Sequence, residues 1–161
     1  MKTILVLGLV FATGCGKDED ESKNNGNNLG NNSEKIVSDP EGTITIAVRN
    51  YDGKTWTSVR PDGCDNDAIG IGMDNNFFGY SRDYWDFATF GKVSGLGNVN
   101  KIPTSGWANA VAVTLGTGYV ARYQGGNKTT YVRIYVIDYI LSATSGGVIG
   151  ANIKYQSPFE P

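Results

Sequence analysis

The chain has 161 residues and contains no histidine, which limits the chemistry that its other residues can do. Ser-His-Asp and Cys-His catalysis, imidazole general bases and His-ligated metals all require that side chain. A serine–lysine mechanism has a Ser-x-x-Lys signature, and the chain has none. We therefore expect a non-catalytic protein that needs no cofactor.

One loop gathers side chains that could hold calcium. Asp62, Asp65 and Asp67 lie within six residues and Asn66 lies among them, so several oxygen ligands are close together in sequence. The spacing is not that of an EF-hand loop. Asp, Asn and Gly are also common in turns because their side chains satisfy nearby backbone groups, and we favour this second interpretation.

Aromatic residues are the positive feature of the chain. Flat rings with a polar tip can stack on sugars or anchor partner proteins, so Trp56, Tyr84, Trp85 and Trp107 are candidate ligand-binding residues. The alternative is packing in the core and across strands, since aromatic residues favour β-strands. Tyr84 and Trp85 follow a charged pair in a predicted turn, and we expect this ring pair to be the first to test.

The N-terminal segment has the pattern of a secretory signal peptide. Lys2 precedes an apolar run at residues 4–11, small residues at 12–14 and then Cys15. The run is far shorter than the roughly 20 residues of a membrane-spanning helix, so we expect residues 1–14 to be cleaved. The ending resembles a lipobox, although Ala12 replaces the usual leucine, and this implies a lipid anchor on Cys15. An ordinary cysteine after an ordinary signal peptide is the alternative.

Residues 15–41 form a predicted disordered tether, because an acidic and Asn-rich segment cannot bury enough apolar surface to order itself. Residues 1–41 hold seven of the 16 acidic groups, and the remaining domain has a net charge of only +1. We therefore expect no nucleic-acid partner. Residues 17–21 (Lys-Asp-Glu-Asp-Glu) resemble the surface-export signal of Bacteroidetes lipoproteins, which implies an outer-membrane protein facing the cell exterior. The alternative is a charged spacer on the periplasmic side.

Cys64 is the only thiol left once Cys15 carries lipid, so no disulfide can form within the mature chain. In an oxidising compartment a lone cysteine is either buried or free to pair with another molecule. We expect Cys64 to be buried.

Residues 42–161 are predicted to form one all-β domain. Short stretches alternate apolar and polar residues and are separated by Gly, Asn and Pro turns. The predicted strands cover residues 42–49, 68–73, 77–80, 86–93, 110–115, 119–124, 130–140 and 148–155. The strands at 110–115, 119–124 and 130–140 are expected to form an antiparallel meander, in which Val132, Ile134 and Val136 face the core, and 148–155 is the final strand. Seven or eight short strands indicate an antiparallel sandwich or small barrel.

Six short stretches of the folded part form a recognisable set. They are Gly42-Thr-Ile-Thr-Ile, Gly95-Leu-Gly-Asn-Val, Ile102-Pro-Thr-Ser-Gly-Trp-Ala-Asn, Gly118-Tyr-Val-Ala, Arg133-Ile-Tyr-Val-Ile-Asp-Tyr and Gly146-Gly-Val-Ile-Gly-Ala-Asn-Ile-Lys-Tyr-Gln. Together they resemble a family of uncharacterised Bacteroidetes surface lipoproteins over residues 42–159. The resemblance implies a compact envelope domain and assigns no activity or functional residue.

These observations favour a surface-displayed binding module on a lipid anchor, with an extracellular glycan or protein as its ligand. A structural envelope lipoprotein or assembly subunit without a ligand of its own is the alternative. An enzyme is the interpretation that the composition supports least.

Overall fold

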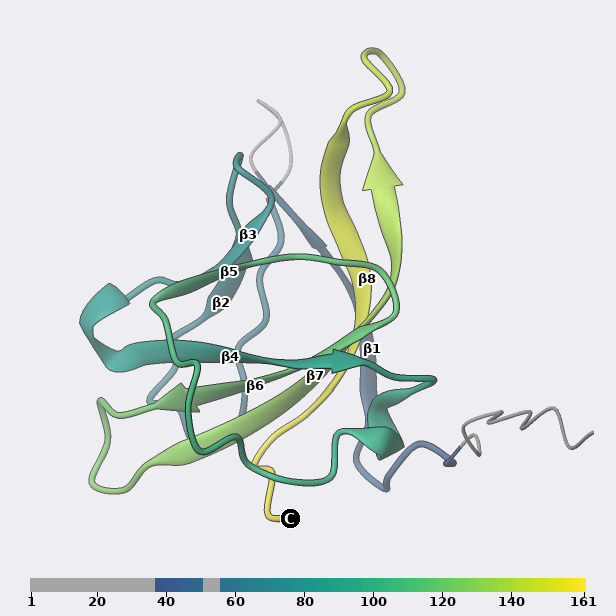
Figure 1. The fold of residues 1–161 in the computed structure, drawn as a ribbon. Helices are drawn as coiled ribbons and strands as arrows, with labels where there is room; N and C mark the ends of the chain where they lie inside the picture. The colour runs from purple at the N-terminus through teal and green to yellow at the C-terminus, as the bar shows by residue number, and fades with distance from the viewer. Residues whose placement is uncertain (1–36, 51–55) are drawn as a thin grey trace, which may run out of the picture. The chain divides into compact units, whose positions relative to one another are not determined.

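The computed structural model describes residues 37–50 and 56–161, which form an almost entirely β-stranded domain (Figure 1). Its strands are β1 (Ile44–Arg49), β2 (Ile69–Ile71), β3 (Asn76–Gly79), β4 (Trp85–Lys92), β5 (Ala110–Ala112), β6 (Thr117–Tyr123), β7 (Thr130–Leu141) and β8 (Val148–Gln156). Two short 3₁₀ helices, η1 (Arg82–Tyr84) and η2 (Leu96–Asn98), flank β4. Each strand overlaps a predicted one, so the all-β prediction is confirmed. Cys15 and most of the predicted tether lie outside the described residues, and within them no helix is long and apolar enough to span a membrane.

The larger sheet contains five antiparallel strands in the order β1-β8-β7-β6-β4. β6 and β7 form a hairpin, which confirms this part of the predicted meander, and β8 pairs antiparallel with β7 on its other side. β1 lies on the far side of β8, with Ile44 opposite Tyr155 and Arg49 opposite Gly150. The first strand of the domain therefore pairs with its last strand.

The smaller sheet contains β2, β3 and β5, with β3 in the middle. The sequence predicts β5 as part of the C-terminal meander, and this is wrong, because β5 pairs with β3 and places Val111 opposite Phe77. Both edges of β6 are already occupied by β4 and β7, so no place remains there for β5. The chain passes from the smaller sheet to β6 through a turn in which Gly116 has a φ of 62°, a conformation that glycine adopts readily.

Isolated bridges link the two sheets at both of their edges. Thr57 pairs with Arg49 of β1, and Val59 pairs with Ile69 of β2, so this segment joins the two strands. On the opposite side Ala108, just before β5, pairs with Phe87 of β4. The sheets therefore close into a small barrel whose hydrogen bonding is incomplete, in agreement with the predicted sandwich or barrel.

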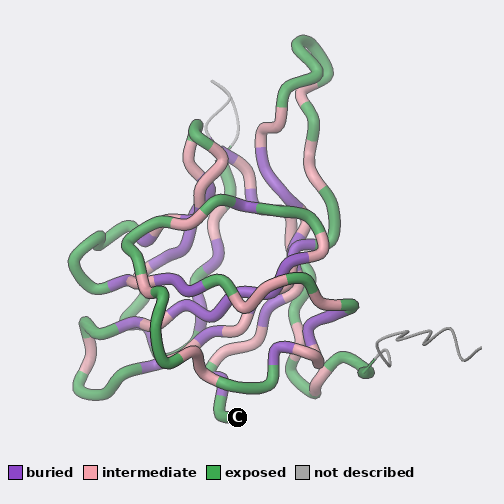
Figure 2. The backbone as a smooth tube through the Cα atoms, viewed as in Figure 1, coloured by how far each residue is buried: buried purple, intermediate pink, exposed green. Residues whose placement is uncertain are grey.

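The core lies between the two sheets, whose inward-facing residues are buried (Figure 2). Val132, Ile134 and Val136 of β7 are all buried, which confirms the prediction from their alternation. Phe77 of the smaller sheet stacks on Phe87 of the larger one, with ring centroids 6.3 Å apart. Each such side chain stabilises the fold by about 1.5–3 kcal/mol when it leaves water completely. The smaller sheet therefore packs on the core through its inner face, and its outer face does not take part in the core.

The folded part begins before residue 42, where the sequence predicts the tether to end. The Asp39 carboxylate accepts a hydrogen bond from Lys154 Nζ at 2.5 Å, and the Glu41 carbonyl accepts one from Gln156 Nε2 at 2.7 Å. Residues 37 and 38 lie against Gly97 of η2. The alternation of β1 marks only the start of a strand and gives no sign of these residues, which are held by contacts with distant parts of the chain.

Candidate functional site

Three aromatic rings form a row on the outer face of the smaller sheet. Phe78 and Tyr80 lie two positions apart, so both point away from the face that buries Phe77. Their ring centroids are 5.3 Å apart, and the Trp56 ring lies 4.8 Å from Tyr80 in an edge-on arrangement. Trp56 and Tyr80 are each 41% exposed. The aromatic row, Trp56–Tyr80–Phe78, therefore presents apolar ring surface to solvent.

A glycine beneath the row allows the rings to lie close to the sheet. Gly70 of β2 is directly opposite Phe78 of β3. A Cβ atom at position 70 would lie 3.0 Å from Cζ of Phe78 and 3.4 Å from the ring of Tyr80. Aromatic side chains often cover a glycine on the neighbouring strand in this way. The row thus depends on the pairing of β2 with β3 as well as on the rings themselves.

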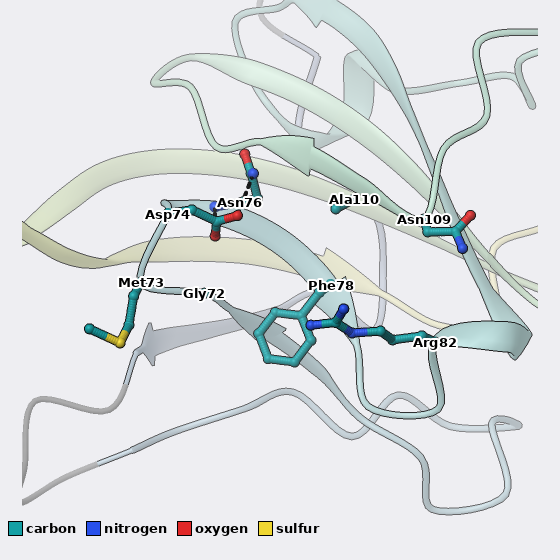
Figure 3. A pocket seen from close by; sticks show the side chains of 8 residues that line it. All are labelled: Gly72, Met73, Asp74, Asn76, Phe78, Arg82, Asn109 and Ala110. Carbon is teal, nitrogen blue, oxygen red and sulfur yellow. Dashed lines mark hydrogen bonds between the residues drawn. The ribbon is translucent and has the colours of Figure 1, made fainter.

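The row ends at a cavity of about 440 Å³, in which Phe78 supplies the aromatic wall (Figure 3). This volume lies within the range of small-molecule sites, roughly 300–1,000 Å³. The lining residues come from the β2–β3 turn, β3, η1 and the start of β5: Gly72, Met73, Asp74, Asn76, Phe78, Arg82, Asn109 and Ala110. In Figure 3 the Arg82 side chain extends toward the Phe78 ring, and Met73 lies at the opposite end.

The β2–β3 turn holds the acidic group of the cavity in place. Gly72 N donates to the Asn76 carbonyl at 2.9 Å, and Asn75 takes a φ of 58°, which asparagine tolerates better than most residues. The Asp74 carboxylate accepts hydrogen bonds from Asn76 Nδ2 at 2.8 Å and from Asn76 N at 3.3 Å. The carboxylate is therefore positioned before any ligand arrives, and it keeps free lone pairs.

Two donors of the cavity have no partner in the described part of the chain. The side chains of Arg82 and Asn109 form no hydrogen bond or ion pair with any residue of 37–50 or 56–161. Arg82 supplies a fixed fork of N–H donors, and the Asn109 amide both donates and accepts. The site thus combines one aromatic wall, one cation, one anion and two amides.

The Tyr80 hydroxyl remains protonated at neutral pH. Burial raises its pKa above the ordinary value of 10.0, and the nearby positive charge of Arg60 opposes this effect. The hydroxyl can therefore donate a hydrogen bond at the exposed edge of the aromatic row.

Trp85 does not belong to a binding surface, and this candidate is wrong. It is the first residue of β4, and its side chain is only 1% exposed. The indole packs in the core against Phe87 at 6.1 Å and Tyr123 at 5.0 Å. The polar Arg82 and Asp83 before it indicate a turn that includes Trp85. In the structure this turn ends at Tyr84, and Trp85 already belongs to β4 and points inward. A ligand cannot reach the ring without unfolding the strand.

Trp107 and Tyr84 lie in two other places. Trp107 is half-buried on the outer face of the larger sheet, where the Arg122 guanidinium covers its ring at 4.5 Å, so one ring face is already occupied. Tyr84 is 47% exposed and has an edge-on contact with Tyr123 at 6.1 Å. Of the four aromatic candidates, only Trp56 lies in the aromatic row.

The acidic loop connects to the residue before η1. Within residues 37–50 and 56–161 no three acidic or thiol groups converge on one point, so the structure adds no support for a calcium site at Asp62, Asp65 and Asp67. Asp67 Oδ1 instead accepts from Ala68 N at 2.7 Å and from Ser81 N at 3.4 Å. This interaction ties the loop to the residue before η1.

Cys64 is buried, as expected, at 1% exposure. Burial raises the pKa of its thiol from 9.0 to about 12, and the negative charges of Asp67, Asp65 and Asp62 add to the effect. The thiolate is the reactive form of cysteine, so this side chain is unreactive in the folded protein.

Phe78, Arg82 and Asn109 do not stand out in the sequence as one site. A partial signal exists, because Asn76, Phe78 and Tyr80 share one face at a period of two. The contribution of Asn109 has no local signal, since it depends on the pairing of β5 with β3 across more than 30 residues.

Comparison of the chain with protein-family models, curated proteins and solved structures gives no match.

Proposed function

We propose that this chain is a lipid-anchored envelope protein facing the cell exterior, and that its β domain is a non-catalytic binding module. The binding surface is the aromatic row together with the cavity that follows Phe78. The anchor is the lipid expected on Cys15, and the expected tether carries the domain away from the membrane. No chemistry is assigned to the site, because its groups suit recognition of a ligand rather than proton transfer or nucleophilic attack.

The observation that carries this proposal is the exposure, on one surface, of two large aromatic rings and of two polar side chains that have no partner within the described residues. Trp56 and Tyr80 each leave two-fifths of their surface in water, and Arg82 and Asn109 lack partners in the described part of the chain. Contiguous exposed apolar surface bordered by polar groups marks interaction sites in soluble domains.

The binding surface can be tested without knowing the ligand. A mixture of small aromatic, sugar-like and amide fragments is added to the isotope-labelled full-length chain, and backbone amide shifts are followed by NMR. We expect the shifts to concentrate at Met73, Asn76, Phe78, Arg82 and Asn109. Shifts that cluster elsewhere, or no shifts at all, would contradict the binding module and favour the structural alternative.

The location can be tested in cells that produce the full-length chain. Wild-type protein should incorporate radiolabelled palmitate and should be degraded by protease added to intact cells. Cys15→Ala should lose the label and leave the membrane fraction. Protection of the wild-type protein in intact cells, with degradation only after lysis, would place it on the periplasmic side.

A further inference from the structure

We infer that the ligand is an uncharged saccharide chain, with one sugar ring in the cavity beside Phe78 and the following units along Tyr80 and Trp56. This inference rests on the proposed binding function and adds the class of ligand. It follows from three properties of the site: the chemistry of its walls, the balance of its charges and the tilt of its rings.

A pyranose ring has an apolar face of C–H groups and a rim of hydroxyls, and the cavity offers a surface for each. The Phe78 ring lines one wall, where a flat aromatic ring can pack on the C–H face. The Arg82 fork, the Asn109 amide and the Asp74 carboxylate are the polar groups around it. Hydroxyls both donate and accept, so a rim of hydroxyls needs donors and acceptors side by side. This set supplies both.

The charges of the cavity favour a neutral ligand. Arg82 contributes one positive charge and Asp74 one negative charge, and no other charged side chain lines the cavity among the described residues. An anionic sugar or phosphate would gain from Arg82 but would be repelled by Asp74. An uncharged hydroxyl accepts from the first and donates to the second, so both charged groups gain a partner.

The aromatic row extends the site in one direction. The Phe78 and Tyr80 rings are inclined by 51°, and the Tyr80 and Trp56 rings by 72°. Successive units of most polysaccharides are also rotated with respect to one another, so rings of different tilt can each meet one unit. A flat ligand, such as a nucleobase stack, would require parallel rings.

A peptide fits this surface less well than a saccharide. Extended peptides are usually recognised by main-chain hydrogen bonds to the open edge of a sheet. Here the cavity lies on the face of the smaller sheet, where β3 is already paired on both sides, and the available groups are side chains. The geometry therefore favours a ligand that carries its own hydroxyl donors and acceptors.

Affinity electrophoresis of the full-length chain tests the ligand class. The probes are soluble β-glucan, xylan, mannan, galactan and dextran, and isothermal titration follows for any that retards the protein. We expect retention by at least one probe, and a loss of affinity of about tenfold or more in Phe78→Leu, Arg82→Ala and Asn109→Ala. Phe78→Leu keeps an apolar side chain and removes only the flat ring. Lys101→Ala and Asn127→Ala are matched controls at exposed positions outside the cavity, and they should bind as the wild type does.

The outcomes separate this inference from the proposed function. Fragment shifts at the cavity without retention by any polysaccharide would overturn the saccharide ligand and leave the binding module standing; displacement of those fragments by a peptide library would then identify the peptide class. Retention that Phe78→Leu, Arg82→Ala and Asn109→Ala leave unchanged would place glycan binding elsewhere and also overturn the inference. If no fragment shifts are seen and no polysaccharide retards the protein, both proposals are overturned. Thermal unfolding of each variant shows whether it folds, and Arg82→Gln provides a second test at an exposed position.

Discussion

Gly79 and Trp85 are in direct contact: the indole lies where a side chain at position 79 would begin. A Cβ built at 79 would overlap the Trp85 ring and would be 2.5 Å from Trp85 Cβ, which cannot swing away as the end of a flexible side chain could. Gly79 is therefore required for the indole to enter the core beside Phe87. This relationship also explains why Trp85 is unavailable to a ligand.

The first prediction concerns this contact. Gly79→Ala should lower the free energy of unfolding by about 1–3 kcal/mol, because the added methyl group overpacks a filled core. Urea unfolding followed by circular dichroism measures the change. Gly147→Ala is the matched control, since the nearest atom to a Cβ there is Ser145 Oγ at 3.4 Å, and it should change stability by less than about 0.5 kcal/mol. Equal stability of Gly79→Ala and wild type would contradict the packing described here.

A second prediction concerns Arg122, which joins Trp107 to the larger sheet. Its guanidinium covers the Trp107 ring at 4.5 Å and binds the Asp86 carboxylate through two nitrogens, each at 2.9 Å. Arg122→Ala should therefore lower the free energy of unfolding by about 1 kcal/mol. Arg122→Lys should recover only part of the loss, because an ammonium group cannot form the two-nitrogen contact and stack at the same time. Urea unfolding distinguishes these variants, and an unchanged Arg122→Ala would show that the covered ring face contributes nothing.

A third prediction concerns alkaline pH. Burial raises the pKa of Cys64 to about 12 from 9.0, and it also raises those of Tyr119, Tyr123 and Tyr155 above 10.0. Above pH 9 the unfolded chain loses protons that the folded chain retains, so stability should be complete below pH 9 and should fall as pH rises further. Urea unfolding between pH 7 and pH 11 measures this decline.

Cys64→Ala is the informative variant for the pH profile. Its stability should begin to fall at a higher pH than that of the wild type, because only the tyrosines then contribute. A wild-type profile that stays flat to pH 11 would be inconsistent with the raised pKa values. Thiol reagents provide an independent measurement, since Cys64 should react at pH 8 only after denaturant is added.

A fourth prediction concerns the glycine beneath the aromatic row. Gly70→Val should lift the Phe78 and Tyr80 rings from β2, because even a Cβ atom approaches Phe78 to 3.0 Å. We expect the affinity for the polysaccharide that retards the wild-type protein to fall several-fold. Stability should change by less than about 1 kcal/mol, because valine suits a strand better than glycine does. Unchanged affinity would show that the rings do not need to lie close to the sheet.

Local patterns predict the strands of this fold but not their neighbours. Alternation along residues 130–140 identifies β7 and its buried face, because the period of two follows directly from strand geometry. The placement of β5 beside β3 has no such signature, since strand order depends on which edges remain free after the rest of the sheet has formed.

The same limit explains the candidate site. Trp56 is recognisable as an exposed aromatic candidate, yet its partners Tyr80 and Phe78 gain their role only when β2 brings Gly70 beneath them. Trp85 is the same residue type as Trp56, yet it is buried whereas Trp56 is exposed. The difference arises because Gly79 leaves space for the Trp85 indole in the core. Residue type predicts which side chains can bind, whereas long-range pairing determines which of them are exposed.

The pairing of β1 with β8 has a consequence for the time at which the domain can fold. Ile44 meets Tyr155 across an interval of more than 100 residues, and β8 also separates β1 from the rest of the larger sheet. A chain that emerges from its N-terminus therefore cannot complete this sheet until β8 is free. Contacts of such high sequence separation also slow folding, because a long loop must close before they form. The barrel therefore closes only after β8 has been synthesised and released.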